Sequence, residues 1–178
     1  MFDCHFDLLM YILLYKKQNR IDELKKYCEE VLNKDNIIGG IFNLFYTGPD
    51  KMKEEFGKET SKISLTEDLM EAKEAIVKHS IIPENINYLI GIEGLDYLKE
   101  IDEIDDLYKL GLRSTNIVWN NQNKFGGGTK SPEEAGLTTL GEALVEKLVK
   151  TNIAIDLSHT NEKTFWRNYR KSKRNQKT

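Results

Sequence analysis

His5 and Asp7 have the residue types and the spacing of a metal-binding pair. The segment that contains the first of them, Phe2–Phe6, is predicted to be a short strand, and residues two apart along a strand point to the same side. An imidazole and a carboxylate directed at one point suit a divalent metal such as zinc. The spacing alone is common in proteins. A surface His5 beside an Asp7 that caps the following helix is the alternative interpretation.

Glu93 and His159 each follow another predicted strand. Glu93 comes after Asn87–Ile92, where a buried carboxylate is costly unless it is paired, hydrogen-bonded or bound to metal. His159 comes after Ile153–Leu157, where that strand gives way to a helix. A solvated loop glutamate and a helix-initiating histidine are the alternatives. The third histidine, His79, ends an amphipathic helix, where solvent or the helix dipole accounts for it.

The segments that must position these residues alternate between strand and helix. The expected strands are Phe2–Phe6, Ile37–Tyr46, Asn87–Ile92, Arg113–Trp119 and Ile153–Leu157. The expected helices are Leu8–Leu32, Glu67–His79 with Thr66 as N-cap, Ile104–Leu110 with Gly111 as C-cap, Thr139–Lys150, and one that begins at Thr160. Loops are expected over Gly57–Thr60 and Asn120–Gly136.

This alternation predicts an α/β fold of parallel βα units, either a doubly wound sheet or a (β/α)₈ barrel. A dinucleotide-binding sheet would need a G-x-G-x-x-G motif directly after a strand. The glycines of 126–128 instead follow a polar loop. The barrel is favoured because its strands all end at one face, where His5, Glu93 and His159 would converge.

Composition excludes several classes of protein. The chain is 39% hydrophobic and 31% charged with a net charge of −3, which is typical of a globular protein and not of a nucleic-acid binder. Two cysteines, Cys4 and Cys28, are too few for a disulfide framework and are expected to be reduced thiols. Because the sequence offers no membrane-spanning run and no signal peptide, a cytoplasmic location without membrane contact is expected.

Several short motifs, taken together and in order, resemble the membrane (renal) dipeptidase family. They are FDCHFDLL at residues 2–9, GIEG at 91–94, LYKLGLR at 107–113, WNNQN at 119–123, GLT at 136–138 followed by Gly141, and IDLSH at 155–159 followed by Phe165 and Trp166. The resemblance extends from residue 3 to about residue 166.

The resemblance implies a (β/α)₈ TIM barrel that binds two zinc ions and hydrolyses the peptide bond of dipeptides with a water molecule activated between the metals. His5 and Asp7 would bind the first zinc ion, Glu93 would be the catalytic residue that bridges both, and His159 would bind the second. Asn123, in the asparagine-rich loop, is the candidate substrate-binding residue. A dipeptide is therefore the expected partner.

The family pattern also requires a further histidine, an aspartate and a substrate-binding arginine that cannot be placed in this sequence. We therefore expect a barrel truncated to about five βα units, with a partial metallodipeptidase domain at residues 1–166 and a basic, disordered tail at residues 167–178. Self-association through exposed sheet edges is expected. The alternatives are a non-catalytic remnant, a weak metal-binding protein and an interaction protein that uses the basic tail.

Overall fold

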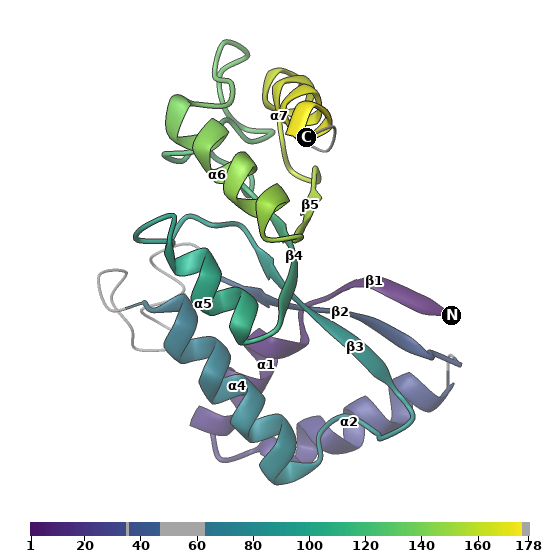
Figure 1. The fold of residues 1–178 in the computed structure, drawn as a ribbon. Helices are drawn as coiled ribbons and strands as arrows, with labels where there is room; N and C mark the ends of the chain where they lie inside the picture. The colour runs from purple at the N-terminus through teal and green to yellow at the C-terminus, as the bar shows by residue number, and fades with distance from the viewer. Residues whose placement is uncertain (35, 47–62, 176–178) are drawn as a thin grey trace. The chain divides into compact units, whose positions relative to one another are not determined.

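Strands and helices alternate along the chain in the computed structural model, which describes residues 1–34, 36–46 and 63–175 (Figure 1). The strands are β1 (Phe2–Phe6), β2 (Gly39–Phe45), β3 (Asn87–Glu93), β4 (Leu112–Asn116) and β5 (Ala154–Asp156). The helices are α1 (Leu8–Lys17), α2 (Ile21–Lys34), α4 (Leu65–His79), α5 (Glu103–Lys109), α6 (Thr139–Lys150) and α7 (Glu162–Asn175). The expected loop at Gly57–Thr60 lies outside the described residues.

The five strands form one sheet in which spatial order equals sequence order, β1-β2-β3-β4-β5. The pairing is parallel between β1 and β2, where Phe2 is opposite Gly39, and between β4 and β5, where Ser114 is opposite Ala154. A parallel neighbour needs a crossover connection, which the intervening helices provide. The predicted α/β class with five βα units is confirmed.

The chain divides into two compact units, Met1–Gly91 and Ile92–Thr178, and the boundary falls inside β3. In the first unit, α1 packs against β2, α2 and α4. One face of α1 is apolar and fully covered, which places the core of this unit under that helix. The buried residues of α1 are Leu8, Leu9, Met10, Ile12 and Leu13.

The single helix expected over Leu8–Leu32 is wrong, because the chain forms α1 and α2 with a turn between them. The backbone reverses at Asn19, whose φ of 55° lies in the left-handed region that asparagine tolerates better than most residues. The N–H of Arg20 donates to the carbonyl of Tyr15 at 2.9 Å and satisfies one of the last carbonyls of α1. The broken apolar period of this segment therefore marked two helices.

The first turn of α4 corrects a second expectation. Thr66 was expected to cap this helix, but the N-cap is Ser64, whose hydroxyl accepts a hydrogen bond from the N–H of Glu67. Both residues are of the type that caps helices. The helix begins earlier because Leu65 is fully buried and so belongs to the apolar face of α4.

In the second unit, α6 packs against β5 and α7. The helix α6 has the expected bounds, and Thr138 caps it by accepting the N–H of Gly141 at 3.0 Å. At the end of α5 the C-cap residue is Leu110, and Gly111 follows it with a φ of 111°. Both cysteines are free thiols, with Cys4 exposed and Cys28 buried.

The expectation of a disordered tail from residue 167 is corrected by α7, which continues as a helix to Asn175. Its basic side chains meet glutamates of α6, which lies beside it (Figure 1). Arg167 Nε lies 2.7 Å from Glu142 Oε1, and Lys171 Nζ lies 2.5 Å from Glu146 Oε1. The helix α7 also carries buried polar residues such as Asn168, which is 1% exposed. None of the helices in the described part of the chain is both long and apolar enough to cross a membrane.

Candidate metal centre

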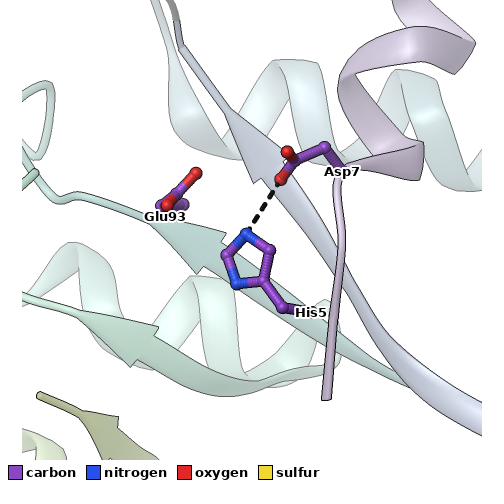
Figure 2. A group of neighbouring side chains, drawn as sticks. All are labelled: His5, Asp7 and Glu93. Carbon is purple, nitrogen blue, oxygen red and sulfur yellow. Dashed lines mark ion pairs between the residues drawn. The ribbon is translucent and has the colours of Figure 1, made fainter. Parts of the chain in front are cut away.

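His5 and Asp7 face each other in the first unit, as Figure 2 shows, with His5 Nε2 3.2 Å from Asp7 Oδ1. His5 stands on β1, and its backbone N–H donates to the Oδ1 atom of Asp3 at 3.0 Å. Asp7 occupies the N-cap position of α1, but its side chain makes no capping hydrogen bond. The alternative interpretation of Asp7 as a capping residue is therefore not supported, and the carboxylate is directed toward the imidazole instead.

The Oδ1 atom of Asp7 is buried and accepts no hydrogen bond from any residue that the structure describes. The His5 contact has ion-pair distance but not hydrogen-bond geometry. An orphaned buried carboxylate oxygen is costly, and native proteins satisfy nearly all such atoms with a donor, water or an ion. A divalent cation would satisfy the oxygen of Asp7 and would also accept a lone pair from His5, so this donor set fits a metal.

Glu93, the third side chain in Figure 2, ends β3 and belongs to the second unit. Glu93 is only 6% exposed to solvent. Directly after it, Gly94 has a φ of 80° and donates its N–H to Asn116 Oδ1 at 2.9 Å. The N–H of Leu95 is bonded to the carbonyl of Ile117 at 3.4 Å. The turn that follows Glu93 is therefore fixed to the end of the neighbouring strand β4.

The second unit brings Glu93 and His159 together, with His159 Nε2 2.9 Å from Glu93 Oε1. Glu93 is the last residue of β3 and His159 follows β5, and these strands are separated in the sheet by β4. Their meeting agrees with the expectation that side chains at the carboxyl ends of parallel strands converge. The alternatives of a solvated loop glutamate and a simple helix-initiating histidine do not describe this pair.

His159 adopts a φ of 66°, a left-handed conformation that is uncommon for a residue with a side chain. The turn that precedes it is tightened by the N–H of Ser158, which donates to Asp156 Oδ1 at 2.8 Å. The carbonyl of His159 accepts the N–H of Thr129 at 2.9 Å. A strained backbone held in this way often occurs at a functional site.

Asn120 is a contact of His159 that the sequence did not single out. Its Oδ1 atom lies 3.2 Å from His159 Nδ1. The sequence placed Asn120 in the asparagine-rich loop and gave no reason to prefer it over its neighbours. Only the fold brings this loop to the turn after β5, because the two segments are far apart in sequence.

Asn123, the candidate substrate-binding residue, has its side chain engaged with its own loop. Its Nδ2 donates to the carbonyl of Ile117 at 2.9 Å, and its Oδ1 accepts the N–H groups of Phe125 and Gly126 at 2.8 and 3.1 Å. These bonds shape the turn that leads to α6. A substrate-binding role for Asn123 stays a prediction.

Comparison with known proteins identifies the family. An α/β fold of parallel strands, with imidazole and carboxylate groups after those strands, is the kind of scaffold on which divalent metals are held. The model of the membrane dipeptidase family, peptidase family M19, matches residues 1–174. The chain therefore belongs to the membrane dipeptidase family, as its motifs indicated.

Among curated proteins, an uncharacterised protein of Acinetobacter calcoaceticus is 36% identical over 85 residues, which are 44% of this chain and 27% of that protein. Dipeptidase aclJ of Aspergillus oryzae is 34% identical over 82 residues, which are 44% of this chain and 19% of that protein. The chain thus aligns with less than a third of the length of each of these relatives.

Among solved structures, a metallopeptidase of Rhodobacter sphaeroides, liganded with a phosphinate mimic of the dipeptide L-Ala-D-Ala, is similar with a TM-score of 0.65 and 21% identity. The match covers 95% of this chain and 61% of that protein. An amidohydrolase of Pseudomonas aeruginosa is similar with a TM-score of 0.54 and 16% identity, over 97% of this chain and 48% of that protein. These likenesses confirm the predicted lineage, a (β/α)₈-type fold with five of its βα units.

Proposed function

We propose that this chain carries metal ligands of a metal-dependent dipeptidase with a binuclear zinc site. The observation that carries the proposal is the pairing of the buried carboxylate of Glu93 with His159 Nε2 at 2.9 Å, at the carboxyl ends of β3 and β5. Membership of the membrane dipeptidase family supports the reaction class. The phosphinate dipeptide mimic named with the Rhodobacter metallopeptidase supports a dipeptide as the substrate.

In this proposal His5 and Asp7 would hold one zinc ion, His159 would hold the other, and Glu93 would be a ligand shared by both. The donors suit the metal, since zinc takes imidazole nitrogen and carboxylate oxygen at about 2.0–2.2 Å. When bound, the metals would polarise the peptide carbonyl of the substrate and lower the pKa of a water molecule.

The residues of this chain would orient the site and limit its access to water. Glu93 is covered by protein, so its charge would be little screened by solvent. Glu93 and His159 are the side chains of the second unit that would hold a metal, each through a lone pair. Asp7 Oδ1, which accepts no hydrogen bond from the described residues, would have a metal ion as its partner. A cytoplasmic location and self-association stay predictions.

The metal assignment is tested by titrating Zn²⁺ into the purified, metal-free chain and following heat release. We expect the His159→Ala variant to lose at least about tenfold in zinc affinity. The His79→Ala variant is the matched control, because it removes a histidine at the end of α4 that the proposal does not use. Equal zinc affinities for the wild type and the His159→Ala variant would refute the assignment.

The substrate class is tested with the phosphinate mimic of L-Ala-D-Ala as the probe. It is titrated into the chain with zinc and, separately, with a chelator. We expect binding that requires zinc and is competed by the free dipeptide L-Ala-D-Ala, but not by alanine. Binding that does not change when zinc is removed would contradict a metal-dependent dipeptide site.

A further inference from the structure

The ring of His159 is held at both of its nitrogens within the second unit. Nε2 lies 2.9 Å from Glu93 Oε1, and Nδ1 lies 3.2 Å from Asn120 Oδ1. The ring also lies beside the indole of Trp119, with 6.1 Å between the ring centroids. Both polar neighbours present oxygen atoms, which are hydrogen-bond acceptors.

The amide of Asn120 is itself held in place. The hydroxyl of Thr129 donates to Asn120 Oδ1 at 3.1 Å, and the N–H of Lys130 donates to the Asn120 carbonyl at 2.7 Å. Gly128 makes this close approach possible, since a Cβ there would stand 2.2 Å from the carbonyl oxygen of Trp119. The acceptor that faces His159 is therefore part of a fixed loop.

The same loop also holds the backbone of His159. The N–H of Thr129 donates to the His159 carbonyl at 2.9 Å, and Gly128 forms a β-bridge with Thr160. The N–H of Asn161 donates to the carbonyl of Gly127 at 3.1 Å. The backbone of the turn and the ring are thus fixed by the same short segment, so Asn120 cannot move away from the ring independently.

A neutral imidazole carries one proton, and here two acceptors compete for it. A proton on Nδ1 is donated to Asn120 and leaves the lone pair of Nε2 available for a metal. A proton on Nε2 is donated to Glu93 and prevents metal binding through that nitrogen. The carboxylate is the stronger acceptor of the two, because it is charged. Glu93 therefore holds the proton on Nε2 while no metal is bound, and an acceptor on the Nδ1 side is needed for the proton to leave Nε2.

We infer that Asn120 is a positioning residue that accepts the ring proton of His159 on Nδ1 when Glu93 does not hold it on Nε2, and so allows Nε2 to bind a metal. A partner on the second ring nitrogen fixes the tautomer of metal-binding histidines in general, and its loss lowers metal affinity by about 10–100-fold. The part of this inference that concerns metal affinity rests on the proposed function. The part that concerns the ring proton does not.

The ring proton is observed by ¹⁵N NMR of the histidine side chains in the metal-free chain. The spectrum is recorded at about pH 8.5, well above the ordinary histidine pKa of about 6.5. Only three histidines are present, and His5→Ala and His79→Ala variants complete the assignment. In the wild type we expect the proton of His159 mainly on Nε2, where Glu93 is the stronger acceptor. In the Glu93→Ala variant, which lacks that acceptor, we expect the proton mainly on Nδ1. Adding Asn120→Ala to Glu93→Ala should move it to Nε2, and adding Asn120→Asp instead should keep it on Nδ1, because aspartate restores the acceptor.

Two further variants keep the test decisive. Thr129→Val removes the hydroxyl that steadies Asn120 Oδ1 at an exposed position, and when it is added to Glu93→Ala we expect a smaller shift of the ring proton toward Nε2. Asn121→Ala, at the exposed neighbouring asparagine, should leave the ring unchanged. In the Glu93→Ala background, an unaltered tautomer with both Asn120→Ala and Thr129→Val would overturn the inference.

Zinc titration of the Asn120 variants with Glu93 intact gives the second readout, with an expected loss of about 10–100-fold for Asn120→Ala and recovery in Asn120→Asp. If the wild type binds no zinc, the proposed function fails while the NMR result still decides the role of Asn120. If zinc binds and Asn120→Ala binds it as tightly as the wild type, the positioning role fails while the metal site stands.

Discussion

Glu93 and His159 form an ion pair of 2.9 Å at a position where the carboxylate is almost completely covered by protein. A buried charge of this kind is costly unless opposite charges, hydrogen bonds or a metal ion compensate it. The contact would therefore have two roles in the proposed site. His159 compensates the carboxylate while metal is absent, and the contact keeps the two metal-binding side chains next to each other.

The variant Glu93→Gln tests the bridging role. An amide has no charge and is a poor zinc ligand, so we expect zinc affinity to fall by about 10–100-fold or more at both proposed positions. The measurement is calorimetric titration of zinc. Glu84→Gln, at an exposed turn position, is the control and should bind zinc like the wild type. Unchanged zinc binding in Glu93→Gln would exclude the carboxylate as a ligand.

The variant Asp7→Asn separates a metal ligand from a structural carboxylate. In the metal-free chain the buried Asp7 Oδ1 accepts no hydrogen bond from the described residues, so its replacement should not lower the free energy of unfolding. The rise in melting temperature that zinc causes in the wild type should be absent in Asp7→Asn. Urea unfolding and thermal melts with and without zinc measure the two effects. A loss of more than about 2 kcal/mol in the metal-free variant would instead show a structural role.

Hydrolysis by the 178-residue chain alone is expected to stay near background. In the proposed site, His5, Asp7 and Glu93 would give one metal three donors, but Glu93 and His159 would give the other only two, while catalytic zinc is generally held by three protein ligands. The test is an assay on a panel of alanyl dipeptides with added zinc, with and without chelator. Robust turnover that the chelator stops and that His159→Ala abolishes would contradict this expectation.

The cap of α6 should contribute measurably to stability. The hydroxyl of Thr138 accepts the N–H of Gly141 at 3.0 Å and is also within 2.8 Å of the carbonyl of Lys124, so it links the helix to the asparagine-rich loop. We expect Thr138→Ala to lower the free energy of unfolding by about 1 kcal/mol, within a range of about 0.5–2. Thr138→Ser, which keeps the hydroxyl, should stay close to the wild type in denaturant titrations.

The two thiols should differ in reactivity. Burial raises the pKa of the Cys28 thiol to about 12, whereas Cys4 is exposed. Because the thiolate is the nucleophile, iodoacetamide at about pH 8 should modify only Cys4 in the folded chain, as mass spectrometry of peptides will show. Rapid modification of Cys28 in the native state would contradict its burial.

The raised pKa of Cys28 also has a consequence for stability. A group whose pKa is higher in the folded state contributes stability that is complete below its unfolded pKa of about 9 and is lost as the pH rises through about 12. The free energy of unfolding should therefore fall in that alkaline window. In Cys28→Ser this alkaline loss should be smaller.

Much of the sheet was predictable because strand periodicity is a local property of the sequence. The polar residues after those strands were also predictable, since parallel strands share one carboxyl end, and this placed Glu93 near His159. The position of Asn120 was not predictable, because its contact with His159 depends on the packing of a long loop. The helix α7 was missed for a related reason. Its basic residues have the composition of a solvated tail, and their ion pairs with the glutamates of α6 depend on how the two helices pack.

The order of the strands has a consequence for how the polypeptide is made. Each strand pairs with the strand that comes next in sequence, so Phe2 meets Gly39 and Ser114 meets Ala154 across a single intervening segment. Contacts of this modest sequence separation favour rapid folding. Pairing of β1 with β2 needs nothing beyond Phe45, so it is available while later parts of the chain are still on the ribosome. Synthesis from the N-terminus can therefore add the strands to the sheet one at a time, in the order in which they are translated.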